Sequence, residues 1–232
     1  MFRFNDKAMR AARLNGRAAK VARLNGRVVW ASGLRSIHDE FDTLDYDFWR
    51  LACDPASTRA YPYVSGGYLR PGIPGSLFSG KPAQSCYTQE EVDNEQGEWI
   101  VRIGATSGTA GLYSGVILGT DDASGRMTEV VWDRNGIRFR YRTAMTNSWI
   151  TLGSTSITIS GGEIMRVTRT IESGSARVRV YEDGVLRGNW LDSSHIPGAP
   201  GGKFVGVRVQ SDLNFFSSLV SPPVAEFTFS SS

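Results

Sequence analysis

From about residue 37 onward, hydrophobic and polar residues alternate with a period of two, and short runs of glycine, asparagine and aspartate interrupt the alternation. This pattern is typical of β-strands that bury one face, because successive side chains of a strand point to opposite sides. We therefore expect an all-β domain with hardly any helix. The expected strands are residues 99–103, 113–118, 129–132, 137–142, 149–152, 156–159, 164–171, 177–181, 185–187, 204–209 and 225–229.

Two turns predict hairpins in this domain. Asn135-Gly136 and Asp183-Gly184 each separate two expected strands, and both pairs tolerate the positive φ angles that a tight hairpin turn requires. About a dozen strands at intervals of roughly ten residues predict an antiparallel β-sandwich of two sheets, or jelly roll. Residues 71–85 and 192–202 are rich in glycine, proline and serine, and we expect them to form long loops.

The first thirty residues follow a different pattern. The segment Ala-Arg-Leu-Asn-Gly-Arg begins at Ala12 and again at Ala22, with a weaker copy from Arg3 to Lys7. The Asn-Gly pairs predict tight turns of a short β-meander, which is too small to be stable alone and therefore needs a larger partner. The residues expected to dock on that partner are Arg13, Leu14, Asn15, Gly16, Arg17, Arg23, Leu24, Asn25, Gly26, Arg27 and Trp30.

Charge separates this leader from the rest of the chain. Residues 1–30 hold eight Lys or Arg and one acid, a net charge of +7, whereas the whole chain carries +3, which leaves −4 for residues 31–232. A basic arm can bind nucleic acid, but these charges recur at regular intervals within a turn pattern, so docking to a neighbouring subunit is favoured over nucleic acid. We predict a leader at 1–30, a linker at 31–36 and a β-sandwich at 37–232.

Composition narrows the class further. The chain of 232 residues is 41% hydrophobic, and its 11 Phe, 8 Tyr and 6 Trp suffice for a sizeable core. No apolar run is long enough for a transmembrane helix, and no hydrophobic signal region follows Met1, so we expect no membrane contact and retention in a cytoplasm. Cys53 and Cys86 form neither a metal cluster nor a disulfide framework, and we expect two free, partly buried thiols.

One strand pattern indicates a binding surface. Arg138, Arg140 and Arg142 share one face of their strand opposite three hydrophobic residues, and Arg177 and Arg179 likewise oppose two valines. We therefore expect one sheet surface to carry a cluster of arginines. Because arginine offers a planar fork of donors, such a cluster suits an anionic or hydroxyl-rich ligand; an ordinary solvated face is the alternative interpretation.

Aromatic residues provide a second set of candidates for sugar binding, because the C–H faces of sugars stack on aromatic rings. The candidates that lie in or near expected loops are Tyr61, Tyr63, Trp149 and Trp190. Three other tryptophans are expected in the core: Trp49, Trp99 and Trp132.

The body resembles concanavalin A-like lectin/glucanase domains. Asp39-Glu40-Phe41-Asp42 and the Gly-turned segment 64–70 are similar to the opening strands of such domains, and 180–185 is similar to their recurrent Asp-Gly hairpin. Segments 206–209 and 225–229 resemble their final two strands. The resemblance spans roughly residues 37–230 and implies a jelly roll that contacts glycans.

The leader, which ends in Val28-Val29-Trp30, resembles leader segments of virion proteins from tailed bacteriophages, particularly minor tail proteins of phages that infect Actinobacteria. This resemblance implies a structural virion protein assembled in the host cytoplasm: a minor tail or fibre-type homotrimer whose leader attaches to other virion proteins and whose jelly roll contacts a host-envelope glycan. A capsid-surface decoration or head fibre protein is the alternative location.

A glycan hydrolase is the alternative of a different class. Glucanases of this fold carry a Glu-x-Asp-x-Glu strand, and Glu91, Asp93 and Glu95 match its spacing, which would place three carboxylates on one strand face. Asn94 stands where the family has a hydrophobic residue, and the flanking residues are polar, which indicates an acidic loop. We therefore expect a binding protein that is not an enzyme.

Metal ligands are few. Lectin-like relatives often hold Ca2+, so the resemblance makes Asp121 and Asp122 candidate ligands, with an ordinary hairpin loop as the alternative. His38 and His195 are too few for a convincing transition-metal site. We expect no other cofactor.

Overall fold

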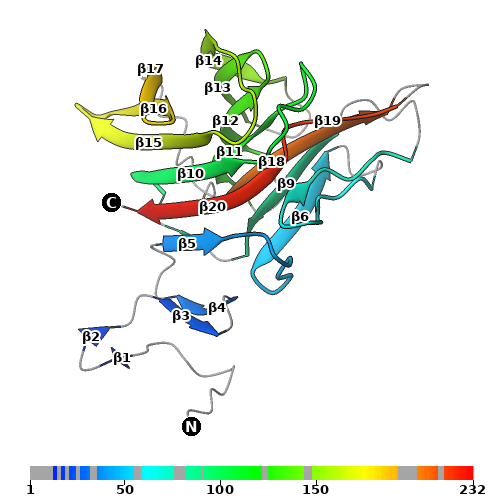
Figure 1. Ribbon diagram of the computed structural model, residues 1–232. Coiled ribbons are helices and arrows are strands. Elements are labelled where there is room, and N and C mark those ends of the chain that lie inside the picture. Colours follow the sequence, from blue (N-terminus) through cyan, green and yellow to red (C-terminus); the bar gives the residue numbers. More distant parts are fainter. Residues whose placement is uncertain are drawn as a thin grey trace.

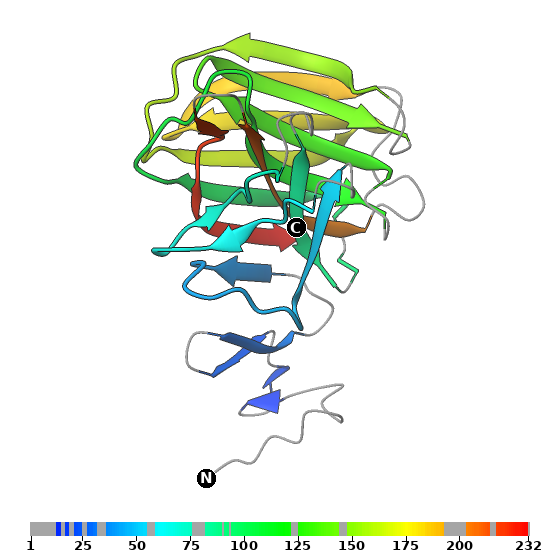
Figure 2. The same ribbon diagram turned by 90° about the vertical axis from the view of Figure 1, so that its right-hand side faces the viewer.

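The computed structural model describes residues 13–14, 17–18, 21–24, 27–31, 36–54, 59–75, 82–89, 91–92, 94–121, 125–143, 148–192, 203–213 and 217–231. Two eight-stranded antiparallel sheets form the body, and the described residues contain no helix. The predicted all-β sandwich is confirmed. Figure 1 shows the sheets as two layers, and Figure 2 looks at the molecule from the side of the layer that contains β11 to β14.

The first sheet, called the β14–β6 sheet, carries the candidate site. Its strands in spatial order are β14 (Ile150–Ser156), β13 (Gly136–Arg142), β12 (Met127–Asp133), β11 (Ser114–Thr120), β18 (Phe204–Leu213), β9 (Ala83–Thr88) and β6 (Trp49–Asp54), with β19 (Ser218–Val220) beside β18.

The second sheet, called the β17–β7 sheet, covers the other side of the core. Its strands in spatial order are β17 (Val185–Asp192), β16 (Ser175–Glu182), β15 (Ile164–Glu172), β10 (Gly97–Ile103), β20 (Val224–Ser231), β8 (Leu69–Arg70) and β7 (Tyr63–Val64), with β5 (Ser36–Asp39) also on β20.

The core lies between the inward faces of the two sheets, as the period-two alternation predicts. β16 shows the alternation clearly, because every second residue from Ala176 to Glu182 is buried. Trp49, Trp99 and Trp132 are at most 1% exposed, which confirms their expected place in the core. Burial of such aromatic rings contributes a large share of the stability of a sandwich of this size.

Trp190 lies in β17, close to the end of this strand at Asp192, and packs at the edge of the sandwich. Its ring stacks on Phe139 with centroids 6.2 Å apart and packs against the main core cluster. A Cβ on Gly153 or Gly188 would lie 2.1 Å and 2.3 Å from this ring, so glycine is required at both places. The first glycine is on β14 and the second on β17, so Trp190 joins the edge strands of both sheets.

The two predicted hairpin turns differ in conformation. Asp183 and Gly184 have φ angles of 46° and 81°, as the prediction of a tight turn with positive φ requires. The other turn consists of Arg134 and Asn135, because Asp133 pairs with Gly136, so the predicted turn lies one residue too late. The Asp133 carboxylate accepts a hydrogen bond from Asn135 N at 2.9 Å, which stabilises this turn without the glycine.

Two other local predictions are wrong. β9 begins at Ala83, inside the expected loop 71–85, because this segment pairs with β6 and β18 on both sides. Residues 157–160 do not form the separate strand expected at 156–159; β14 ends at Ser156. In the latter region the amides of Ile157 and Ile159 donate to carbonyl groups of the β12–β13 turn.

The described part of the leader forms two hairpins. β1 (Arg13–Leu14) pairs with β2 (Arg17–Ala18), and β3 (Val21–Leu24) pairs with β4 (Arg27–Ala31). These strands belong to two separate two-stranded sheets, whereas the prediction was one meander. The Asn-Gly pairs at 15–16 and 25–26 lie outside the described residues, and so does the segment 32–35, which belongs to the predicted linker 31–36.

Neither cysteine forms a disulfide bond, as expected, and both are buried rather than partly buried. Cys53 on β6 is 4% exposed and Cys86 on β9 is 0% exposed. Burial raises the pKa of the Cys86 thiol well above its usual value, and the nearby Asp39 raises it further. The Cys86 thiol is therefore protonated and unreactive at neutral pH.

Candidate functional site

The outer face of the β14–β6 sheet collects the predicted arginines of one strand. β13 alternates Ile137 and Phe139, both 0% exposed in the core, with the arginines on the outer face. Neighbouring β12 directs Glu129, Val131 and Asp133 to the same outer face, since its alternate residues Val130 and Trp132 belong to the core cluster. The alternation on 137–142 therefore identifies this face correctly.

A buried ion cluster lies at the centre of this face. Glu129 is 0% exposed and accepts hydrogen bonds from Arg140 Nε at 2.8 Å and from Arg208 Nη1 at 3.0 Å and 3.1 Å. Arg208 comes from β18, on the far side of β11. Gly115 on β11 lies directly opposite Arg208, and a Cβ on this glycine would lie 2.2 Å from Val130 O on β12. We call Glu129, Arg140, Arg142, Arg208 and Trp149 the buried arginine cluster.

A contact across the sheet shows that the outer face is concave. The guanidinium of Arg142 on β13 forms an ion pair with the carboxylate of Asp54 on β6, and these strands are five positions apart in the sheet. In a flat sheet five strand spacings amount to about 24 Å, which is beyond the reach of one arginine and one aspartate side chain. The sheet must therefore curve around this face.

Aromatic rings cover the guanidinium groups. The Trp149 ring lies 4.6 Å from the guanidinium of Arg140 and 4.9 Å from those of Arg142 and Arg208. Tyr113 lies over Arg140 at 4.8 Å and over Arg138 at 5.1 Å. Cation–π contacts of this kind stabilise arginines that have lost water, so the aromatic rings fix the positions of the guanidinium groups.

Burial changes the electrostatics of the cluster. It lowers the pKa of Arg208 to about 10, and the attraction of Glu129 opposes this effect while the charges of Arg140 and Arg142 reinforce it. Arg208 therefore remains charged at neutral pH. Arg140 and Arg142 are 7% and 3% exposed, which contradicts the interpretation of these two residues as part of an ordinary solvated face.

A polar pocket of about 700 Å³ opens beside the buried arginine cluster, over the β12–β13 turn and β14. The residues that give it its character are Tyr113, Asn135, Arg138, Thr151, Ser154 and Ser156. Asp133 shapes its wall, because its carboxylate accepts hydrogen bonds from Gly111 N at 2.6 Å and from Asn135 N. The exposed hydroxyl groups of β14 form no hydrogen bond to another described residue and are available to a ligand.

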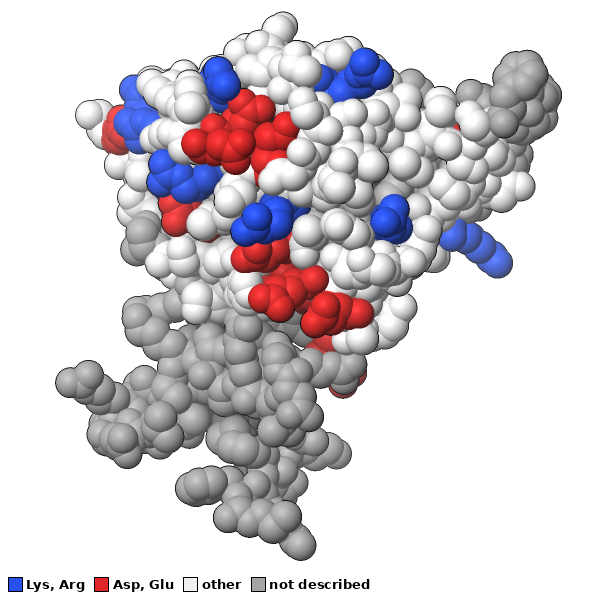
Figure 3. Space-filling view, viewed as in Figure 1, with Lys and Arg blue, Asp and Glu red and all other residues white. Residues whose placement is uncertain are grey.

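The remaining predicted arginines lie elsewhere. Arg177 and Arg179 are on β16, on the outer face of the other sheet, so the expectation of one common surface is wrong. Both donate to Glu172, at 2.5 Å and 2.7 Å. Their hydrogen bonds, first from Arg179 and then from Arg177, lower the pKa of Glu172. Acidic and basic side chains alternate over β15, β10 and β20 in Figure 3, as expected for a solvated face.

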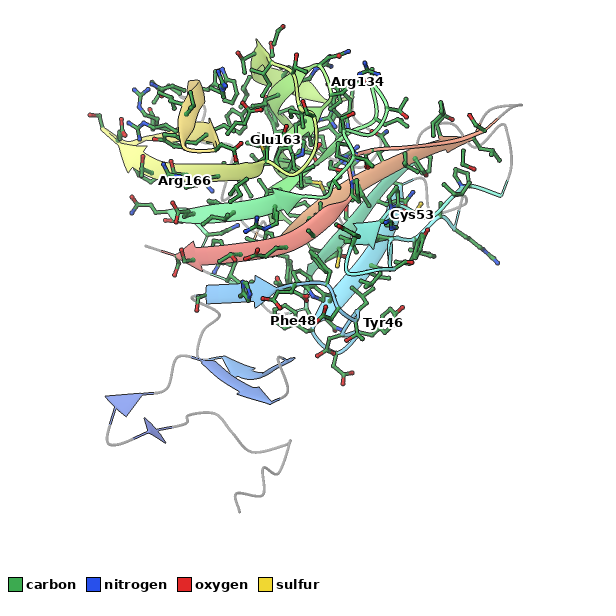
Figure 4. All side chains as sticks on the ribbon, viewed as in Figure 1. Tyr46, Phe48, Cys53, Arg134, Glu163 and Arg166 are labelled. Carbon is green, nitrogen blue, oxygen red and sulfur yellow. The ribbon has the colours of Figure 1, made fainter. Side chains whose placement is uncertain are left out.

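Figure 4 labels one arginine from each sheet: Arg166 on β15 of the β17–β7 sheet, and Arg134 in the turn between β12 and β13 of the β14–β6 sheet. Arg166 forms an ion pair with Glu98 at 3.1 Å. Arg134 is exposed beside the pocket.

The other aromatic candidates are dispersed. Tyr61 and Tyr63 are 43% and 46% exposed at the start of the β7–β8 hairpin, on the second sheet. Trp190 is partly buried, and its ring stacks on Phe139 of the core. Trp149 is the predicted platform that the structure brings together with the predicted arginines.

The acidic motif does not form the strand that a glucanase mechanism needs. Residues 91, 92 and 94–96 lie in the connection between β9 and β10, and Asp93 is outside the described residues. Asn94 is 2% exposed and donates to Leu118 O at 2.6 Å, which anchors the connection as a loop. Glu91 and Glu95 are exposed, and Glu91 lies 3.7 Å from Lys203 Nζ.

Asp121, one of the two candidate calcium ligands, accepts backbone hydrogen bonds instead. Both carboxylate oxygens of Asp121 accept hydrogen bonds, from Gly125 N at 2.8 Å and from Arg126 N at 3.1 Å, and Asp122 lies outside the described residues. Among the residues that the structure describes, no group of three or more His, Cys, Asp or Glu could hold a metal ion.

Sequence reasoning missed Glu129, Arg208 and Tyr113. Glu129 alternates with the buried Val130, and Arg208 lies between two buried valines, so the period-two pattern places both on an outer face. The contact between Glu129 and Arg208 could not be predicted from the sequence, because 79 positions separate the two residues.

The fold is that of concanavalin A-like lectin and carbohydrate-binding jelly rolls. The chain is similar to the carbohydrate binding module CBM66 from Bacillus subtilis, with 10% identity and a TM-score of 0.51, over 82% of this chain and 96% of that one. It is similar to the exoplasmic/lumenal domain of VIP36 in its Ca2+/Man3GlcNAc-bound form, with 11% identity and a TM-score of 0.52, over 85% and 89%.

A third similar structure is LamAcat from Zobellia galactanivorans, with 11% identity and a TM-score of 0.53, over 84% of this chain and 96% of that one. Identities this low establish the fold and no more. No protein-family model matches the sequence, and no curated protein is similar to it in sequence. The part of the chain that the structure describes has no helix long and apolar enough to span a membrane.

Proposed function

We propose that this protein binds a glycan in the pocket on the concave face of the β14–β6 sheet. The observation that carries the proposal is the pocket itself, in which exposed hydroxyl groups of β14 face Arg138 and the Tyr113 ring. Hydroxyl and amide groups beside an aromatic ring are the chemistry that recognises a sugar, which needs directed hydrogen bonds and a flat apolar surface. Two of the similar structures, a carbohydrate binding module and a domain bound to Man3GlcNAc, support this function.

The site favours binding without hydrolysis, although glycoside hydrolases also share the fold. A retaining glycosidase needs two carboxyl groups about 5 Å apart, one of which is protonated. On the concave face, Glu129 is bound by two guanidinium groups and the Asp133 carboxylate by two backbone amides. Both carboxylates are therefore held in structural interactions, and we expect no release of reducing sugar from polysaccharides, with no change when Glu91 and Glu95 are replaced by glutamine.

A panel of immobilised oligosaccharides tests the binding function. The protein should bind at least one member of the panel, and Ser154→Trp, which fills the pocket, should abolish the binding. Ser218→Trp is the matched control, because Ser218 is exposed on β19, outside the pocket lining. Equal binding by the wild type and by Ser154→Trp would place the glycan elsewhere and refute the proposed site.

We also propose that the leader attaches the protein to a partner. Its net charge of +7 and its paired Leu14–Arg17 and Leu24–Arg27 ladders support a folded basic appendage that docks on another protein. Together with the resemblance of the leader to those of phage minor tail proteins, this favours a virion component whose jelly roll faces the host envelope. The trimeric state and the tail location, as opposed to the capsid, are part of this proposal.

A further inference from the structure

Arg138 differs from the other arginines of the concave face. Arg140 and Arg208 pair with Glu129, and Arg142 pairs with Asp54. Arg138 is exposed and, among the described residues, its guanidinium contacts the Tyr113 ring and forms no ion pair with a carboxylate. The pocket lining therefore contains one arginine whose guanidinium forms no ion pair with a described carboxylate.

Contacts with Tyr113 fix the position of the Arg138 guanidinium. Tyr113 lies against both Arg138 and Arg140, and its backbone N–H donates to Gln210 Oε1 at 3.2 Å. Arg140 is in turn fixed by Glu129 at 2.8 Å. The Arg138 guanidinium lies 5.1 Å from the ring centroid and is part of the pocket lining, so its N–H donors are within the site that a ligand would occupy.

The carboxylate in the pocket lining, Asp133, forms no ion pair with Arg138 among the contacts of the described residues. Asp133 is 6% exposed, and its two oxygens instead accept hydrogen bonds from Gly111 N and Asn135 N. The neighbouring strand contributes hydroxyl groups instead: Ser154 pairs directly with Arg138 in the register of β13 and β14, and it is exposed. A cation beside hydroxyl groups suits a ligand that carries both an anion and sugar hydroxyls.

We infer that the pocket selects an acidic saccharide, in which a carboxylate, sulfate or phosphate group pairs with Arg138 while the sugar ring lies against the hydroxyl groups of β14. This inference rests on the proposed glycan-binding function and adds the chemical class of the glycan. A paired, charge-assisted hydrogen bond is roughly twice as strong as a neutral one, so the anion should dominate selectivity.

Four sugars that differ at one position test the inference. Glucose, glucuronate, glucose 6-sulfate and glucose 6-phosphate are titrated separately into the isotope-labelled full chain, and dissociation constants are taken from amide chemical shifts. At least one anionic sugar should bind about tenfold or more tightly than glucose, which corresponds to roughly 1.4 kcal/mol, and the preferred anion identifies the chemistry. Arg138→Ala should abolish this preference, Arg138→Lys should keep part of it, and Arg166→Ala on the other sheet should keep all of it.

The outcomes separate the inference from the function on which it rests. If glucose binds as tightly as all three anionic sugars, or if Arg138→Ala keeps the preference, the selection of an acidic saccharide is refuted while the pocket remains a glycan site. If none of the four sugars shifts any amide of the pocket, the proposed function is contradicted and the inference falls with it. A preference lost equally in Arg166→Ala would point to general surface charge and would also refute the inference.

Discussion

At the level of single residues, Glu129 holds the buried arginines of the concave face together. It is the carboxylate shared by Arg140 and Arg208, and all three side chains are at most 7% exposed. Removing one partner of a buried ion pair leaves an uncompensated charge that water cannot reach. The cluster therefore acts as one unit, and it positions Tyr113 and the pocket beside it.

This role predicts the effect of Glu129→Ala. The free energy of unfolding should fall by about 3–5 kcal/mol, because two buried guanidinium groups lose their counter-charge. Chemical denaturation measures the change. Glu98→Ala is the control, since the Glu98–Arg166 pair is 35% and 39% exposed and should contribute less than about 1 kcal/mol. A loss at Glu129 no larger than the loss at Glu98 would show that the cluster does not stabilise the sheet.

The ion pairs of Glu172 on β15 make the stability of the protein depend on pH. The arginines on β16 lower the pKa of Glu172 below its usual 4.5, so the ionised carboxylate is favoured in the folded state. Its stabilising contribution is complete above the pKa of the unfolded chain and is lost as the pH falls through the lower, folded pKa. Glu172→Gln should therefore lose less stability on acidification than the wild type does. Parallel unfolding curves of the two proteins below pH 5 would contradict the assignment.

At the scale of strands, Trp190 joins the edges of the two sheets. It occupies the space left by Gly153 on β14 and Gly188 on β17. Trp190→Ala should lower the free energy of unfolding by no more than about 3–5 kcal/mol, the loss for a fully buried aromatic ring, because Trp190 is partly buried. The affinity for the preferred anionic sugar should remain unchanged, because the pocket lining does not include this residue. Loss of saccharide binding in a variant that is still folded would instead restore Trp190 as a sugar platform.

The alternation of hydrophobic residues was sufficient to predict most strands and the sandwich, because burial of one strand face leaves a local signal. It predicted the arginine face of β13 for the same reason. The partner of that face could not be predicted: Arg208 on β18 reaches Glu129 on β12 across β11, and such a contact depends on which strands become neighbours. Similarly, β9 lacks clear alternation, and it becomes a strand because β6 and β18 pair with both of its edges.

At the scale of the whole molecule, we propose that the leader attaches the protein to its partner and that the sandwich binds the ligand. The pairings described for β1 to β4 are all within residues 13–31, so the sandwich should fold without the leader. Deletion of residues 1–30 should leave the unfolding temperature of the sandwich and its affinity for the preferred anionic sugar unchanged, and should abolish incorporation into the assembled particle. Incorporation of the truncated protein would refute the docking function of the leader.

The most direct test of the pocket is a crystal structure of the full chain soaked with the anionic sugar that the titrations show to be preferred. We expect the sugar in the pocket beside β14, with its anionic group on the guanidinium of Arg138 and its hydroxyl groups on the side chains of β14, and the same soak of Arg138→Ala should leave the pocket without the sugar. The sugar bound at Tyr61 and Tyr63, or bound in the pocket with its anionic group directed away from Arg138, would contradict the proposed site.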